Sequence, residues 1–272
     1  MRKIFIIIPL VIFWISSRAQ RSIEGLIRAE KNFAAYSIAQ NTKDAFLKFA
    51  DSSGIVFDQG KPANAITSWN KKQKGPGKLN WHPEYAEIAS SNDFGYTTGP
   101  WNFVFRDTIR ATGYFISVWH IDKKQKWKFL IDLGINLATT DTADASSISI
   151  VQKEPNKKIS PGDQQTLVET EKKFIDEFQQ QGKSAYKNYL SAFSRINRNK
   201  FLPAVNKQWQ QQLLDSMPTQ IKYEFIDLGI SSSGDLGYVY GTTMINGKQD
   251  GYLRIWRKET EGWKIALEVL RY

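Results

Sequence analysis

The chain of 272 residues has no cysteine and only two histidines, His82 and His120. The missing cysteines exclude disulfide bonds, zinc sites built on thiolates and catalysis by a cysteine nucleophile. Two histidines without an H-x-x-x-H spacing form no recognisable ligand set, so we expect no metal and no other cofactor. What remains, 41% hydrophobic and 24% charged residues, is the composition of an ordinary globular protein.

An apolar run near the N-terminus is too short to cross a membrane. Ile4–Ile15 holds twelve residues, whereas a membrane-spanning helix needs roughly 20. Two basic residues precede the run and Ser17-Arg18-Ala19 follows it, which is typical of a signal peptide over residues 1–19 that is cleaved before Gln20. We therefore expect an exported protein, periplasmic or secreted, without integral membrane association after cleavage. The alternative is an uncleaved anchor.

Lysine and arginine outnumber aspartate and glutamate by 37 to 27, which gives a formal net charge of +10. The lysines gather around Gly75-Pro76-Gly77 and at the tip of a predicted hairpin over 122–126, rather than on one face of a helix. Charges on solvated loops of this kind do not form a recognition surface, so we expect no nucleic-acid partner.

One order of residues occurs twice along the chain. Ser91–Gly99 recurs as Ser233–Gly241 at an offset of 142 residues. Two tryptophan-containing segments further on recur at offsets of 137 and 136, and a segment upstream recurs at an offset of 141. The repeat predicts two homologous domains, 20–137 and 165–272, joined by a polar linker over 138–164.

Each repeat places helices first and strands afterwards, which is the order of an α+β fold. Three helices packed on one curved antiparallel sheet would give each domain the shape of a cone. Capping residues and periodicity predict helices over 22–40, from 42 onward, and over 64–72, 166–181, 184–193 and 207–216. Alternation predicts strands over 54–57, 79–89, 94–105, 112–121, 127–136, 221–231, 236–244, 249–258 and 263–271.

A series of short motifs runs through the first repeat: Trp81-His82-Pro83, Ala86-Glu87-Ile88-Ala89, Asp93–Gly99, Gly113-Tyr114-Phe115, Val118-Trp119, Trp127-Lys128 and Asp132-Leu133-Gly134. Together they resemble the SnoaL-like branch of the nuclear transport factor 2-like superfamily, in particular its exported domains of unknown function. The resemblance covers residues 22–137 and, in a more divergent copy, 165–272. It implies two tandem cone-shaped domains. That fold hosts ketosteroid isomerases, dehydratases, polyketide cyclases, epoxide hydrolases and domains without known activity, so it does not by itself select a chemistry.

Asp58 is the expected general base, because the segment 49–62 is similar to the one that carries the catalytic aspartate in ketosteroid isomerases. At the rim of an apolar cone, desolvation would raise the pKa of such a carboxyl toward a useful range. Two departures weaken the match: Phe33 occupies the place of the oxyanion-donating tyrosine, and Ser117 occupies that of the acidic partner. The alternative is an aspartate that caps a turn.

His82 is the second candidate for proton transfer, because it could pair with Asp58 or Glu84. The alternative is an edge-strand histidine packed on an aromatic neighbour. If the sheet faces line the cones, five further side chains would contact a ligand, and the arginine among them would receive a carboxylate. If not, they are core residues or cross-strand partners. They are Tyr96, Ser117, Trp119, Tyr238 and Arg254.

Three classes of function remain open. The first is a module that binds a small apolar or amphipathic ligand in one or both cones, which requires a roomy pocket. The second is a cone-fold isomerase, lyase or hydrolase that uses Asp58 as its base. The third is a scaffold whose sheets pair within the tandem or between two chains, which requires filled cones and a large apolar sheet contact.

Overall fold

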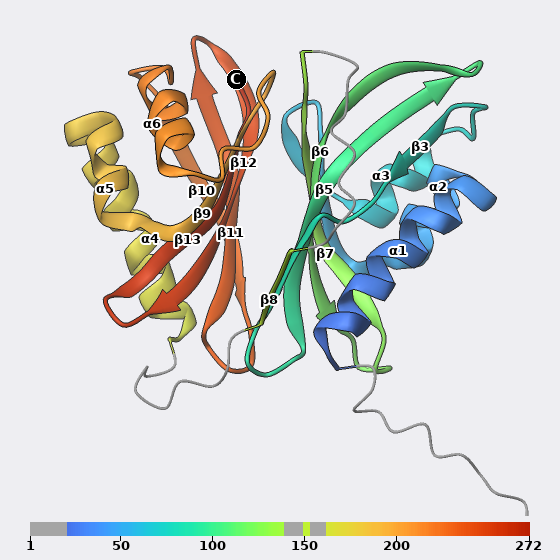
Figure 1. Ribbon diagram of the computed structural model, residues 1–272, viewed down its shortest axis with the longest axis horizontal. Helices are drawn as coiled ribbons and strands as arrows, with labels where there is room; N and C mark the ends of the chain where they lie inside the picture. Colours follow the sequence, from blue (N-terminus) through green and yellow to red (C-terminus); the bar gives the residue numbers. More distant parts are fainter. Residues whose placement is uncertain (1–20, 139–148, 153–161) are drawn as a thin grey trace, which may run out of the picture.

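The computed structural model describes residues 21–138, 149–152 and 162–272. The predicted signal peptide lies outside the described residues, and so does most of the predicted linker. Two curved sheets stand next to each other in the middle of the molecule, and each is covered by helices on its far side (Figure 1). Within the described ranges, no helix is both long and apolar enough to cross a membrane.

The N-terminal domain begins with helices whose first turns are capped by polar side chains. Ser22 Oγ accepts a hydrogen bond from the backbone of Gly25, and the side chains of Asn41 and Asn64 cap the next two helices in the same way. These caps satisfy backbone N–H groups that a helix leaves unpaired at its start. The helices are α1 (Ile23–Ala39), α2 (Thr42–Phe49) and α3 (Ala65–Lys71).

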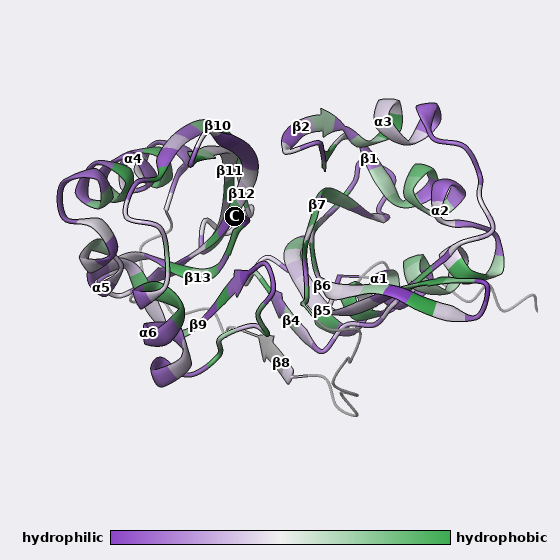
Figure 2. Ribbon diagram, turned by 90° about the horizontal axis from the view of Figure 1, so that it is seen from above, coloured by the Kyte–Doolittle hydropathy of each residue, from purple (hydrophilic) through white to green (hydrophobic). Residues whose placement is uncertain are grey.

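The sheet of this domain has eight strands in the order β2-β1-β7-β6-β5-β4-β8, and β3 and β4 pair with different halves of the long strand β5. The sheet curves around the helices (Figure 2). The strands are β1 (Ala50–Asp58), β2 (Lys61–Asn64), β3 (Lys78–Trp81), β4 (Tyr85–Ile88), β5 (Phe94–Phe105), β6 (Thr108–Ile121), β7 (Trp127–Asn136) and β8 (Ser149–Gln152).

The C-terminal domain repeats this plan with fewer strands, in the order β10-β11-β12-β13-β9. Its first helix is capped by Asp163 and ends at Gly182, where φ is +59°. Asn246 and Gly247 form a hairpin turn, with positive φ at both residues. The elements are α4 (Gln164–Gln181), the 3₁₀ helix η2 (Gly182–Ala185), α5 (Tyr186–Tyr189), β9 (Leu190–Arg198), α6 (Lys207–Asp215), β10 (Lys222–Ile230), β11 (Leu236–Ile245), β12 (Lys248–Glu259) and β13 (Gly262–Leu270).

The predicted α+β fold is confirmed, with several differences in detail. The single strand predicted over 79–89 is two strands, β3 and β4, and the short strand β2 was not predicted. The helix predicted over 184–193 is wrong beyond Tyr189, because the chain extends there into β9 and pairs with the edge of β13, which would otherwise stay open. Both β9 with β13 and β1 with β7 are parallel pairs, so each sheet is mixed rather than wholly antiparallel. Within the predicted linker, β8 pairs with β4.

The two domains pack against each other through the outer faces of their sheets. Besides the core inside each cone, a third apolar core lies between the sheets and takes side chains from both domains. On β7, Ile131 and Leu133 belong to this third core, so alternation along the strand directs Asp132 to the opposite face, into the cone. A buried ion pair between Arg257 and Glu87 joins the domains beside that core.

The repeated segments meet each other where the domains join. The backbone N–H of Ser91 donates to Ser233 Oγ at 3.1 Å, and these two serines are 142 residues apart, which is the offset of the repeat. The ring of Phe94 stacks on Tyr238 with 6.0 Å between centroids. The contact therefore has the self-complementary form of a twofold dimer interface, built within one chain.

Candidate functional site

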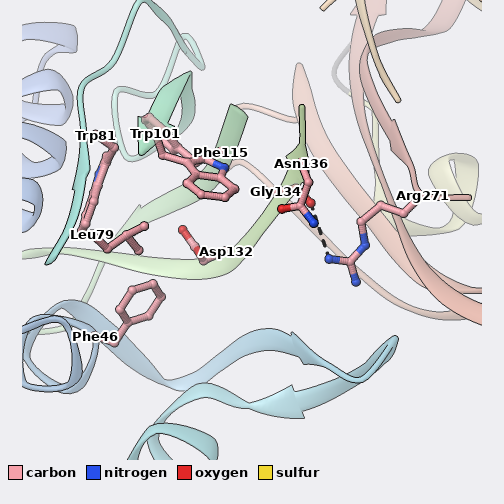
Figure 3. A pocket seen from close by; sticks show the side chains of 9 residues that line it. All are labelled: Phe46, Leu79, Trp81, Trp101, Phe115, Asp132, Gly134, Asn136 and Arg271. Atoms are coloured by element: carbon pink, nitrogen blue, oxygen red, sulfur yellow. Dashed lines mark hydrogen bonds between the residues drawn. The ribbon is translucent and has the colours of Figure 1, made fainter. Parts of the chain in front are cut away.

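A cavity of about 270 Å³ opens at the mouth of the N-terminal cone (Figure 3). Its volume is that of roughly nine water molecules in the liquid, which suits a small molecule. Asp132 lies between an aromatic side of the cavity and a polar side, where Arg271 approaches from the C-terminal domain. The aromatic side is made by Phe46, Leu79, Trp81, Trp101 and Phe115.

Asp132 is a carboxyl group set among apolar walls. Ser117 Oγ donates a hydrogen bond of 2.9 Å to its Oδ2. Burial raises the pKa of Asp132 to about 7, and the nearby negative charge of Glu30 raises it further, whereas the Ser117 hydrogen bond opposes the shift. A carboxyl with this pKa can both accept and donate a proton near neutral pH.

Glu30 lies deeper in the same cone and is fully buried. It accepts hydrogen bonds from Trp81 Nε1 at 2.6 Å, Thr97 Oγ1 at 2.5 Å and Trp119 Nε1 at 2.9 Å. Burial raises the pKa of this carboxyl, against the effect of its three donors. Because Trp81 also lines the cavity, Glu30 fixes the orientation of part of the aromatic wall.

The C-terminal cone holds the same pair of carboxylates at the repeated positions. Glu171 on α4 is the equivalent of Glu30 on α1, at the repeat offset of 141 residues. Its Oε2 accepts a hydrogen bond from Trp256 Nε1 at 3.0 Å, as Glu30 accepts one from Trp119. Glu268 lies on β13 where Asp132 lies on β7. The carboxylate pair is therefore a feature of both repeats.

The two cones differ in the residue between the carboxylates. Arg254 occupies the position of Ser117, is fully buried and pairs with both Glu171 and Glu268. Although burial alone would raise the pKa of Glu268, Arg198 and Arg254 hold it below its ordinary value. In the N-terminal cone the uncharged Ser117 leaves the carboxylates without a cation between them, so Asp132 keeps its raised pKa.

The structure separates the five expected ligand-contacting residues into two groups. Ser117, Trp119 and Arg254 point into the cones and belong to the networks just described. Tyr96 and Tyr238 lie between the sheets, where Tyr96 donates to Glu87 Oε2 at 2.8 Å. Arg254 is fully buried and paired with both Glu171 and Glu268, so a ligand carboxylate would have to displace one of these two side chains.

The two expected proton-transfer residues lie away from the cavity. Asp58 is exposed beside the β1–β2 turn, opposite Lys61, because β1 and its hairpin carry it past the rim of the cone. His82 lies between β3 and β4, partly buried, and its Nε2 has no hydrogen-bond partner among the described residues. The structure does not bring Asp58 and His82 together, and neither lines the cavity.

Asp132, Glu30 and Arg271 were not foreseen as site residues. Asp132 belongs to the recognised motif Asp132-Leu133-Gly134, and Glu30 belongs to the repeated helix segment. An alignment of the repeats that asked which carboxylates occur twice would have found both. Arg271 gives no such signal, since its place at the cavity depends on how the two domains pack.

No known protein family matches the chain, and no curated protein sequence matches it. Three similar solved structures show what the fold resembles. An NTF-2 like (nuclear transport factor 2-like) protein of unknown function from Shewanella oneidensis MR-1 is 16% identical, with a TM-score of 0.34, and the match covers 41% of this chain and 96% of that one. The chain is similar to nuclear transport factor 2-like proteins.

The other two structures carry ketosteroid isomerase names. A ketosteroid isomerase-like protein from Erwinia carotovora atroseptica is 16% identical with a TM-score of 0.32, and covers 42% of this chain and 95% of that one. The Δ5-3-ketosteroid isomerase from Mycobacterium sp. is 14% identical with a TM-score of 0.30, and covers 40% and 90%. Each match spans the length of one domain, and at these identities the likeness concerns the fold alone.

Proposed function

We propose that the N-terminal cone binds a small, apolar or amphipathic molecule. The cavity supports this proposal, because about 270 Å³ is enclosed by aromatic side chains on one side and by a few polar groups on the other. A mostly apolar recess with few convergent polar groups is the usual form of a small-molecule site. The signal-peptide pattern of residues 1–19 supports placing this binding outside the cytoplasm.

In this proposal the C-terminal cone binds no ligand and acts as a scaffold for the N-terminal domain. Its interior is occupied by the Arg254 guanidinium, which lies 4.3 Å from the ring of Phe174, 4.5 Å from Tyr223 and 4.7 Å from Tyr252. Its outer sheet face supplies eight of the 18 buried residues in the apolar core between the domains. The second domain therefore supports the sheet on which Asp132 lies.

Binding is tested with neutral aromatic probes of increasing size: benzamide, indole and 2-naphthamide. Calorimetric titration should show saturable binding of at least one probe to the wild-type chain. Asn136→Trp, at the exposed rim of the cavity, should abolish it, whereas Asn70→Trp, an equally bulky change on an exposed part of α3, should not. Binding that is absent for all three probes, or equal in the two variants, overturns the proposal.

Proton-transfer catalysis is a second candidate function, and the Asp132 carboxyl is the observation that favours it. Its pKa of about 7 suits removal of a proton from a carbon next to a carbonyl and return of that proton elsewhere, as in an isomerase or lyase. Asn136 and Arg271, on the polar side of the cavity, carry N–H groups of the kind that stabilise the oxyanion formed on the carbonyl.

Deuterium uptake from D₂O into 2-tetralone, a bicyclic ketone with acidic C–H groups, tests this candidate by NMR. The wild-type chain should accelerate uptake, and Asp132→Asn should remove the acceleration while 2-naphthamide still binds. Asp58→Asn, the matched exposed change, should leave the rate as it is. Acceleration that survives Asp132→Asn contradicts the assigned role.

A further inference from the structure

One wall of the N-terminal cavity belongs to the C-terminal domain. Arg271 follows β13, crosses to the first domain and lies with its Nη1 3.4 Å from the carbonyl oxygen of Gly134 on β7. Asp250 on β12 fixes the guanidinium from behind, through Nε at 2.9 Å and through Nη2. The side chain of Arg271 is 18% exposed and that of Asp250 is 17% exposed.

These contacts hold the arginine in place without saturating it. A guanidinium has five N–H groups, and Asp250 and Gly134 take three of them. The ring of Phe57 lies 5.8 Å from the guanidinium and covers part of it. Among the described residues no other hydrogen-bond partner of Arg271 is found, which leaves its remaining N–H groups for a ligand in the cavity that Arg271 lines. Because Asp250 already orders the side chain, ligand binding costs little conformational entropy there.

The hydrogen-bond donors that Arg271 presents to the cavity favour one kind of ligand. Asp250 neutralises Arg271 from outside, and Asp132, from β7, faces the same space with Glu30 behind it. An apolar ligand would leave the donors of Arg271 unused on desolvation, whereas a planar carboxylate can accept two of them side by side. A cationic ligand would need a free carboxylate near Arg271, and the Asp250 carboxylate is already paired with that arginine.

We propose that the ligand of the N-terminal cone is a small aromatic or alicyclic carboxylate, whose ring lies among Trp81, Trp101 and Phe115 and whose carboxylate is received by Arg271 of the C-terminal domain. The inference rests on the proposed binding function and names its ligand class. It makes the second domain part of the site, so the cavity is completed by the packing of the two repeats.

The test compares two probes of the same shape, 2-naphthoate and neutral 2-naphthamide, by calorimetric titration of the full chain. The wild type should bind the carboxylate at least about tenfold more tightly than the amide, since hydrogen bonds to charged groups are worth about 1.5–3 kcal/mol. Arg271→Gln should weaken binding of the carboxylate far more than binding of the amide, and so bring the two affinities within about twofold of each other. Arg271→Lys should keep part of the preference. Arg106→Gln, the same change of charge at the exposed β5–β6 turn, should keep all of it.

Because Arg271→Gln leaves Asp250 unpaired, the double variant with Asp250→Asn is measured as well, after its thermal unfolding has shown that it is folded. Equal affinity of the wild type for carboxylate and amide overturns the inference while leaving the binding function intact. So does a loss in Arg271→Gln that is as large for the amide as for the carboxylate, which would indicate a structural role. If the chain binds neither of these probes but does bind benzamide or indole, this inference fails and the binding function stands. If it binds none of the four, both fail.

Discussion

Asparagine at position 132 would remove a titrating carboxyl from the N-terminal cone and keep an oxygen that accepts the hydrogen bond of Ser117. In the folded chain the pKa of Asp132 is raised from 3.8 to about 7, so the folded state binds this proton more tightly than the unfolded state. The associated stability is fully present below about pH 3.8 and is lost as the pH rises through 7. Since one pKa unit corresponds to about 1.4 kcal/mol, the wild type should lose about 2.5 kcal/mol between pH 5 and pH 8 through this group.

Urea unfolding followed by tryptophan fluorescence at pH 5, 6, 7 and 8 measures this effect as the difference between Asp132→Asn and the wild type. Groups that titrate in both proteins and do not interact with Asp132 cancel in that difference. From pH 5 to pH 8, the free energy of unfolding of Asp132→Asn should increase by about 2.5 kcal/mol relative to that of the wild type. The exposed control Asp58→Asn should stay within about 0.5 kcal/mol of the wild type throughout. A difference that is constant with pH, or that moves against the variant, would refute a desolvated carboxyl at position 132.

Three further substitutions test the contacts that hold the molecule together. Arg254→Met leaves both buried carboxylates of the second cone without their shared cation and should lower the free energy of unfolding by about 3–5 kcal/mol, measured in urea. Glu87→Gln breaks the buried pair with Arg257 between the domains, and should cost about 3 kcal/mol and speed proteolysis of the native chain. Trp119→Phe removes one donor from Glu30 and should cost about 1.5–3 kcal/mol by thermal or urea unfolding; an unchanged midpoint would show that the indole N–H is dispensable.

The fold could be predicted because its signals are local or repeated. Side-chain caps such as Ser22, the Asn246-Gly247 turn and the glycine after α4 each report on a few neighbouring residues, and the repeat fixes the order of the elements. The one helix that failed, beyond Tyr189, did so because a distant strand edge required a partner. The residue pattern of a short segment does not show that a distant strand needs a pairing partner.

The site was harder to predict because it depends on register and on domain packing. Cross-strand partners share a face, and the structure pairs Tyr96 with Val118 but Thr97 with Ser117, so Tyr96 faces the other domain while Ser117 faces the cone. Without that register the sequence assigns Tyr96 and Ser117 to one ligand-contacting set. Asp58 was chosen from similarity along a short segment, whereas the role of Asp132 follows from burial, which no short segment reveals.

The difference between Ser117 and Arg254 explains why the two cones lie in one chain. In a symmetric homodimer both cones carry the same residues, so either both carboxylate pairs are neutralised by arginine or neither is. A tandem chain can pack its two sheets in the same twofold manner and still place Arg254 in one cone and Ser117 in the other. The second cone is then free to be filled and ion-paired while the first keeps a cavity and a carboxyl with a raised pKa. The same asymmetry places an arginine of the second domain, Arg271, at the cavity of the first.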